Sequence, residues 1–128
     1  MYNTFKPVQP VGLMDFVRAA KSCITEITPQ ELKEKLDAKE DFVLIDVREP
    51  WEWDVCHLPG AILIPMGELP ARLQELNKAA ETVVICHHGV RSYHAARYLE
   101  TVGFGDVVNL SGGVAAWADE VDPVMPRY

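Results

Sequence analysis

Residues 82–102 read TVVICHHGVRSYHAARYLETV, which is an apolar run, a short glycine-containing loop and a helical pattern in immediate succession. The run Thr82–Ile85 is typical of a strand that is buried on both faces. From Ser92 to Val102 the apolar residues recur at helical spacing, and Gly103 then suits the end of a helix. A buried strand that leads directly into a helix is typical of a parallel α/β sheet, so this stretch predicts the fold class.

The loop between this strand and this helix predicts an anion-binding cradle around a cysteine. Its sequence is Cys86-His87-His88-Gly89-Val90-Arg91. Backbone N–H groups in such a turn point inward, and the start of the following helix adds partial positive charge. Both effects favour a thiolate over a thiol, and both distinguish this cysteine from an inert core thiol. We therefore predict that Cys86 is a nucleophile.

The chain on either side of this stretch also alternates between apolar runs and helical patterns. Three further strands, each buried on both faces, are predicted at Phe42–Ile45, Ala61–Ile64 and Val107–Leu110. Further helices are predicted after the capping box Thr28–Glu31, along the face Met66, Leu69, Leu73 and Leu76 with Pro70 in its first turn, and from Gly112-Gly113 to Trp117. In such folds ligands bind at the carboxyl ends of the strands, where Asp46 and Cys86 both lie.

Arg91 closes the loop at the start of a helix, where the helix dipole disfavours a cation. This position predicts a carboxylate partner, and Asp46 at the end of a neighbouring strand is the natural one. Arg48 and Glu49 follow Asp46 and extend the predicted network. We expect this network to support the loop rather than to take part in the chemistry.

His87 and His88 are expected at the mouth of the cradle, where their protonated forms would attract an anionic substrate. A metal site is a second interpretation of the histidines and cysteines in this region. Its ligands would be Cys86, His87, His88 and His94, with Cys56 and His57 added. This spacing matches no zinc pattern, so we expect neither a metal nor a cofactor.

The segment Cys56–Ala61 predicts a turn that leads into a strand. His57 is expected to be a hydrogen-bonded structural residue. Cys56 is expected to pack in the core, although a role as a resolving thiol stays open. The three tryptophans are expected in the core or in the wall of a pocket, namely Trp51, Trp53 and Trp117.

The whole chain has the size and composition of one soluble domain with a terminal extension. It has 128 residues, 48% of them hydrophobic, and a net charge of −7, which argues against a nucleic-acid partner. No apolar stretch approaches the roughly 18 residues of a membrane span, and no secretory signal is visible. Three cysteines far apart in sequence form no disulfide framework, so we predict a cytoplasmic protein.

Four segments of this chain, in order, resemble the motifs of the rhodanese homology domain. They are Leu44–Pro50, His57–Ala61 with Cys56 where a glycine is usual, the loop Cys86–Ser92, and Leu110–Trp117. The resemblance implies an α/β three-layer sandwich with a five-stranded, mostly parallel sheet flanked by helices. The motifs cover about residues 24–120, and we predict a rhodanese-like domain at residues 23–122 and a C-terminal tail at 123–128. Residues 1–22 are predicted to be an arm with a short amphipathic helix, because Leu13, Phe16, Val17 and Ala20 recur at helical spacing.

The resemblance also implies a sulfurtransferase that works by double displacement. Cys86 would take sulfur from a donor as a persulfide, which the backbone of residues 87–91 would hold, and pass it to a thiol or to cyanide. The loop has two histidines where thiosulfate-using members carry arginine or lysine, so the donor is either thiosulfate or a persulfide. A sulfur-relay protein is a possible partner.

Two other classes of function remain open. A non-catalytic module that docks to another protein is one, although the retained cysteine favours catalysis. A cysteine-dependent phosphatase is the other. Its loop would have five residues between cysteine and arginine, whereas this chain has the four residues 87–90, and a smaller ring suits one sulfur better than a phosphate.

Overall fold

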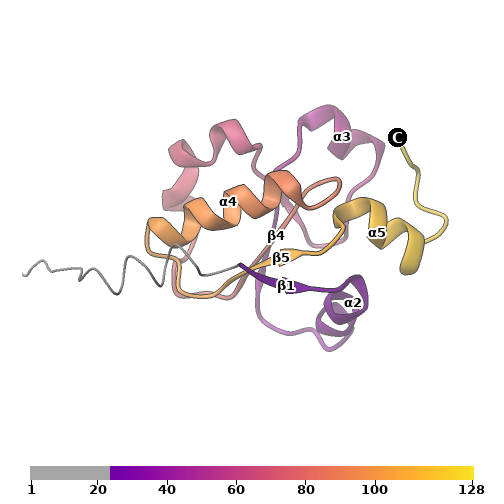
Figure 1. Ribbon diagram of the computed structural model, residues 1–128, viewed down its shortest axis with the longest axis horizontal. Coiled ribbons are helices and arrows are strands. Elements are labelled where there is room, and N and C mark those ends of the chain that lie inside the picture. The colour runs from indigo at the N-terminus through magenta and orange to yellow at the C-terminus, as the bar shows by residue number, and fades with distance from the viewer. Residues whose placement is uncertain (1–23) are drawn as a thin grey trace, which may run out of the picture.

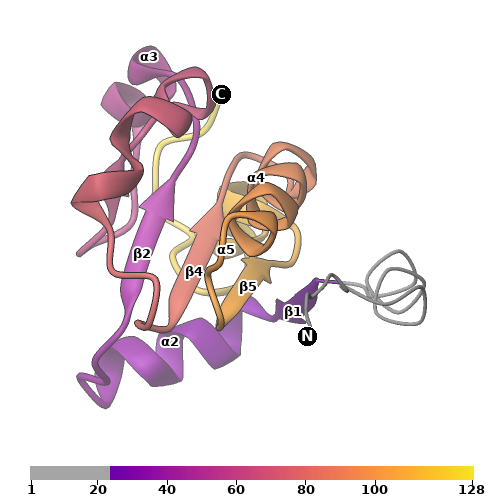
Figure 2. The same cartoon turned by 90° about the vertical axis from the view of Figure 1, so that its left-hand side faces the viewer.

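A five-stranded parallel sheet forms the centre of the structure, a computed structural model that describes residues 24–128. The strands lie in the order β1-β5-β4-β2-β3. Figure 1 labels β1, β5 and β4, and Figure 2 also labels β2. Their bounds are β1 Thr25–Ile27, β2 Val43–Asp46, β3 Ile62–Leu63, β4 Thr82–Ile85 and β5 Val107–Leu110. The helices are α2 Pro29–Asp37, α3 Pro50–Val55, α4 Val90–Thr101 and α5 Gly113–Glu120, with 3₁₀ segments η1 Met66–Glu68 and η2 Pro70–Glu75. The arm and helix predicted for residues 1–22 lie outside the described residues.

Helices cover both faces of this sheet, which confirms the predicted layers (Figure 2). One core lies between the sheet and α4 and includes Val84 and Leu99. The other lies between the sheet and the pair α2 and α5, and includes Val83, Leu32 and Trp117. Because successive side chains of a strand point to opposite faces, β4 contributes to both cores, and all four of its residues are buried.

Several local predictions are confirmed. The capping box is present, since the Glu31 N–H donates to Thr28 Oγ1 at 3.1 Å and the Thr28 N–H donates to the Glu31 carboxylate at 2.8 Å. Strands β2, β4 and β5 lie where the apolar runs predicted them. Helix α4 begins at Val90, two residues before the prediction, and Gly103 follows it with φ of 104° in the left-handed region.

Two predicted elements were wrong in form. The apolar face from Met66 to Leu76 belongs to two short 3₁₀ segments rather than to one α-helix. Pro70 is the first residue of the second segment and has no N–H to continue a helix that starts at Met66. Strand β3 is not buried on both faces, because it has two residues and lies at the edge of the sheet, where Ile62 is 46% exposed.

Two elements were not predicted at all. Strand β1 contains only Thr25, Glu26 and Ile27, two of them exposed, and it pairs with β5 at the other edge of the sheet. Helix α3 is six residues long and begins with Pro50. The expectation for Trp51 was also wrong, because its position in the first turn of α3 leaves its side chain 59% exposed.

The C-terminal residues 123–128 turn back toward the carboxyl edge of the sheet. Met125 is buried, and Arg127 pairs with Asp119 of α5. The end of the chain lies next to α3 in both views (Figures 1 and 2). The segment predicted as a tail therefore packs beside the edge where Asp46 and Cys86 lie. Between residues 24 and 128, no helix combines the length and apolar character needed to cross a membrane.

Candidate active site

The backbone of Cys86 is anchored to the start of α5. The Val114 N–H donates to the carbonyl oxygen of Cys86 at 2.8 Å, and the Ala115 N–H donates to that of His87 at 3.0 Å. Gly113 makes this approach possible, because it has φ of 63° and any Cβ there would collide with both carbonyl oxygens. Gly113, one of the two glycines predicted to open the last helix, thus also fixes the position of the cysteine.

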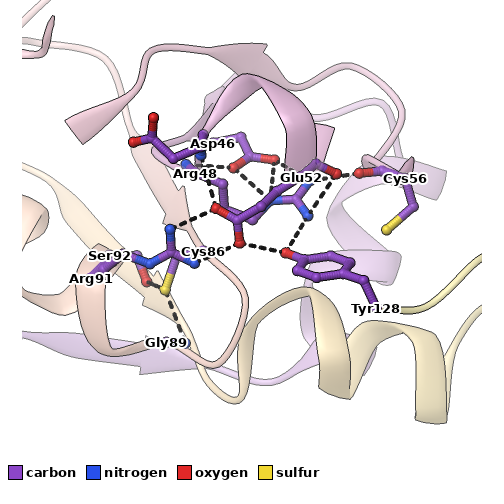
Figure 3. Close-up of polar contacts among 10 residues, drawn as sticks. Asp46, Arg48, Glu52, Cys56, Cys86, Gly89, Arg91, Ser92 and Tyr128 are labelled. Carbon is purple, nitrogen blue, oxygen red and sulfur yellow. Dashed lines mark hydrogen bonds and ion pairs between the residues drawn. The ribbon is translucent and has the colours of Figure 1, made fainter. Parts of the chain in front are cut away.

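The sulfur of Cys86 lies against the start of α4 (Figure 3). The Gly89 N–H donates to Sγ at 3.1 Å, and the Ser92 hydroxyl lies 3.3 Å from Sγ. Gly89 has φ of 97° and is the N-cap of α4, so its N–H faces back into the loop. The Gly89 N–H is thus one of the inward-pointing backbone donors that the sequence predicted around the sulfur. Cys86 itself is only 1% exposed, which limits access to its sulfur.

Arg91 pairs with Glu52 and not with Asp46, so that prediction was wrong. Its Nη1 and Nη2 atoms donate to the two carboxylate oxygens of Glu52 at 2.7 and 2.8 Å (Figure 3). These hydrogen bonds hold the pKa of Glu52 at about 2, against the opposing effect of burial. They also raise the pKa of Arg91, to which the nearby Cys86 contributes. Helix α3 supplies the carboxylate, and the prediction lacked this helix.

Asp46 instead pairs with Arg48, and both side chains are fully buried. The Arg48 Nη2 donates to Asp46 Oδ2 at 2.8 Å and to the carbonyl oxygen of Cys56 at 2.6 Å. Burial lowers the pKa of Arg48, but the hydrogen bonds to Asp46 and Tyr128 outweigh it and raise the pKa overall. The predicted supporting network therefore contains a buried ion pair between Asp46 and Arg48, in place of the expected pair between Asp46 and Arg91.

Tyr128 joins these two ion pairs. Its hydroxyl donates to Glu52 at 2.7 Å and accepts from Arg48 Nη1 at 2.9 Å (Figure 3). Burial is the main cause that raises its pKa to about 12. Its ring centroid lies 4.1 Å from that of His87 and 5.2 Å from that of Trp51. None of these contacts was predicted, because residues 123–128 have no hydrophobic periodicity.

The two loop histidines stack on each other with centroids 4.1 Å apart. His87 is partly buried, and burial together with the charge of His88 lowers its pKa. His87 is therefore neutral at physiological pH, which weakens the predicted attraction of anions by its protonated form. His88 is exposed, and so is Val90 at 65%. A cavity of about 200 Å³ lies beside the loop, with walls that include Cys56, His87, His88, Arg127 and Tyr128.

The remaining candidates have structural surroundings. His57 Nδ1 lies 2.9 Å from the carbonyl oxygen of Trp53, and the two rings stack at 3.8 Å. Cys56 is buried, unpaired, and separated from the Cys86 sulfur by the ion-pair network (Figure 3), which does not favour a resolving thiol. Within residues 24–128, no group of three His, Cys, Asp or Glu side chains is placed to hold a metal.

Three residues of this site were not predicted from the sequence, namely Glu52, Asn109 and Tyr128. Ser92 was placed at the end of the loop motif but was given no role. Glu52 had a local signal, because Glu49-Pro50-Trp51-Glu52 resembles a helix start with proline first, and the Glu49 N–H does donate to Glu52 at 2.9 Å. Asn109 and Tyr128 had no signal of this kind.

Known proteins are similar along most of the chain. The family model "Rhodanese-like domain" matches residues 28–120. The putative sulfurtransferase YtwF of Bacillus subtilis is 43% identical over 100 residues, which cover 78% of this chain and 96% of that protein. The probable adenylyltransferase/sulfurtransferase MoeZ of Mycobacterium tuberculosis is 41% identical over 116 residues, which cover 89% of this chain but only 29% of that larger protein.

The fold is also found among solved structures. A rhodanese-like domain protein from Staphylococcus aureus superposes with a TM-score of 0.71 and 40% identity, over 77% of this chain and 95% of that one. The four motifs, the parallel sheet with its cysteine loop and the family match all agree. This chain belongs to the rhodanese-like domain family.

Proposed function

We propose that this protein is a sulfurtransferase that carries sulfane sulfur as a persulfide on Cys86. The observation that carries the proposal is the position of the Cys86 sulfur, 3.1 Å from the Gly89 N–H at the start of α4. A preorganised N–H donor of this kind stabilises negative charge on sulfur. The names of similar proteins support the same activity, because YtwF and MoeZ are both called sulfurtransferases, as putative and probable respectively.

The reaction has two displacements and needs no external oxidant or reductant. The Cys86 thiolate attacks the outer sulfur of the donor, so a sulfur–sulfur bond forms on Cys86 and the donor's own bond to that sulfur breaks with its electron pair. The negative charge then lies on the outer sulfur of Cys86. An acceptor thiolate or cyanide attacks this outer sulfur and forms a bond to it. The sulfur–sulfur bond to Cys86 then breaks, and its electron pair restores the Cys86 thiolate.

Charges around the loop favour a persulfide over thiosulfate as the donor. The guanidinium of Arg91 is neutralised by Glu52, that of Arg48 by Asp46, and the pKa of His87 is lowered. None of these three groups is left to attract the doubly charged thiosulfate ion. The reacting group of a persulfide carries only one negative charge, and the low exposure of Cys86 limits the donor to a slender group. We propose the same loop for transfer to a thiol of a sulfur-relay partner, in the cytoplasm.

The other two classes of function receive less support. In a phosphatase the closing arginine would bind the substrate oxygens, but both terminal nitrogens of Arg91 already donate to Glu52. A purely non-catalytic module would have no use for the hydrogen bonds that converge on Sγ.

Mass spectrometry of the intact protein tests the proposal. After incubation with glutathione persulfide, wild type should gain one sulfur atom, and addition of a thiol or cyanide should remove it. Cys86→Ser should gain none at that site, because a hydroxyl forms no persulfide, while Cys56→Ser should behave as wild type. Thiosulfate should load the protein more slowly. Transferable sulfur found on Cys56 or Cys23, with Cys86 unmodified in the mapped peptides, would overturn the proposal.

A further inference from the structure

Asn109 contacts Ser92, whose hydroxyl in turn contacts the reacting sulfur of Cys86, and the proposed reaction gives Asn109 no role. It belongs to β5 and is only 2% exposed. Its side chain contacts three segments that are far apart in the sequence. They are β1 through Glu26, the active loop through the carbonyl oxygen of Gly89, and α4 through the hydroxyl of Ser92.

The orientation of the Asn109 amide is fixed by its partners. Its Nδ2 donates to the Gly89 carbonyl oxygen at 3.0 Å and to the Glu26 carboxylate at 3.0 Å, so both N–H bonds are used. Rotation of the amide by half a turn would place Oδ1 against two acceptors, which cannot donate to it. Oδ1 must therefore face Ser92, whose hydroxyl oxygen lies 2.5 Å away.

The Ser92 hydroxyl has one proton and two acceptors within reach. It lies 2.5 Å from Asn109 Oδ1 and 3.3 Å from Cys86 Sγ, and it can donate to only one of them at a time. Donation to Oδ1 turns a lone pair of the hydroxyl toward the sulfur. That lone pair suits a sulfur without negative charge, such as a thiol, whose S–H can donate to it.

When Cys86 is a thiolate, the preferred orientation of the Ser92 hydroxyl is the opposite one. To stabilise a negative Sγ, the Ser92 hydroxyl must rotate and donate to the sulfur, which leaves the buried Oδ1 of Asn109 without a donor. In a persulfide the charge lies on the outer sulfur, so Sγ is uncharged and the hydroxyl can keep its bond to Asn109. The contacts of Asn109 are therefore matched to the loaded enzyme rather than to the free thiolate.

The geometry points to Asn109 as a positioning residue that orients the Ser92 hydroxyl and so favours an uncharged Sγ, as thiol or as persulfide, over the free thiolate. The persulfide part of this inference rests on the proposed function, whereas the thiol part does not. The effect would limit the time that Cys86 spends as a free thiolate between sulfur transfers. Asn109 touches no reacting atom and acts only through Ser92.

Alkylation of Cys86 by iodoacetamide, followed by peptide mass spectrometry across pH, measures the thiol–thiolate balance directly. Removal of the Oδ1 acceptor in Asn109→Ala frees the Ser92 hydroxyl to donate to sulfur. The thiolate should then be favoured by about three- to tenfold, so the midpoint of the alkylation profile should move to lower pH by about half a unit to one unit. Glu52, His87, His88 and Arg91 also surround the site and keep their contacts, so their charges cancel in the comparison. Glu26 loses its hydrogen bond from Asn109 in every Asn109 variant, and the Ser92→Ala background controls for this loss.

Asn109→Asp separates this effect from loss of the Gly89 anchor. Both variants lose the donor to the Gly89 carbonyl oxygen, but aspartate keeps an acceptor for Ser92 and adds negative charge. Its midpoint should therefore stay or rise, opposite in sign to that of Asn109→Ala. The added charge alone would also raise the midpoint of Asn109→Asp, so the dependence on the Ser92 hydroxyl decides between orientation of that hydroxyl and a purely structural role.

The Ser92→Ala variant provides the second test. In that background, Asn109→Ala should cause no further shift, because the hydroxyl through which it acts is gone. Movement of the Asn109→Ala and Asn109→Asp midpoints in the same direction, or a shift that persists without the Ser92 hydroxyl, would overturn the inference. The alkylation result stands even if Cys86 carries no sulfur, so failure of the proposed function and failure of this inference are distinguishable.

Discussion

Replacement of Glu52 by glutamine should destabilise the fold at neutral pH through Arg91. Glutamine has nearly the same shape, but it has no charge, and its amide nitrogen would face a guanidinium or the Tyr128 hydroxyl. In wild type the hydrogen bonds from Arg91 lower the pKa of Glu52 from 4.5 to about 2. This difference corresponds to about 3 kcal/mol of folding free energy. Glu52 is 5% exposed but the Arg91 side chain is 39% exposed, so solvent screening reduces the expected loss to about 2 kcal/mol.

The sign of the pH dependence follows from the direction of this pKa change. A carboxylate with a lowered pKa in the folded state stabilises the protein fully above its unfolded value of about 4.5, and this contribution is lost as pH falls toward 2. The difference in unfolding free energy between wild type and Glu52→Gln should therefore be constant from pH 8 to pH 5. It should fall by about half between pH 5 and pH 3.

Urea denaturation followed by tryptophan fluorescence at several pH values measures this difference. Glu75→Gln is a matched control, because Glu75 also accepts two hydrogen bonds from one arginine, Arg72, but on the exposed surface. No measurable change is expected for the control, since exposed pairs are screened by solvent. A difference for Glu52→Gln that is as large at pH 3 as at pH 7, or that equals the control, would refute the role assigned to this ion pair.

Three further substitutions test other parts of the site. Gly113→Ala should lower stability by about 1–3 kcal/mol and slow Cys86 alkylation, because its Cβ collides with the carbonyl oxygens of Cys86 and His87; a thermal melt like that of wild type would contradict this contact. Tyr128→Phe keeps the ring but loses the hydrogen bonds of the hydroxyl with Glu52 and Arg48, so the free energy of unfolding in urea should fall by about 1.5 kcal/mol. An unchanged midpoint would mean that these hydrogen bonds of the chain end do not stabilise the fold. His87→Arg should lower KM for thiosulfate severalfold at pH 7. The wild-type KM should fall less between pH 8 and pH 6 than an ordinary imidazole would cause, because burial lowers the pKa of His87; a wild-type KM that falls steeply in this range would show that imidazolium recruits the donor.

Much of the site was predictable because its geometry is local. A strand, a glycine turn and a helix start are consecutive in residues 82–102, so the position of Cys86 at the strand end and at a helix N-terminus follows from backbone periodicity. The capping box at Thr28 was predictable for the same reason, since its two hydrogen bonds span three residues. Strand β1 was not, because three residues with two exposed side chains carry no period and become a strand only by pairing with β5.

The sequence by itself determined the loop that places Cys86 between a buried strand and a helix, and the alternation that builds a parallel sheet. Only the tertiary structure decided which charges meet. Asp46 was the expected partner of Arg91, but Arg48 is two residues away and occupies its carboxylate, while Glu52 reaches Arg91 across 39 positions of sequence. Tyr128 joins that pair from 76 positions beyond Glu52. Hydrophobic periodicity reports the backbone of each segment, whereas a buried ion pair depends on the distance between two segments after packing, and no local pattern contains that distance.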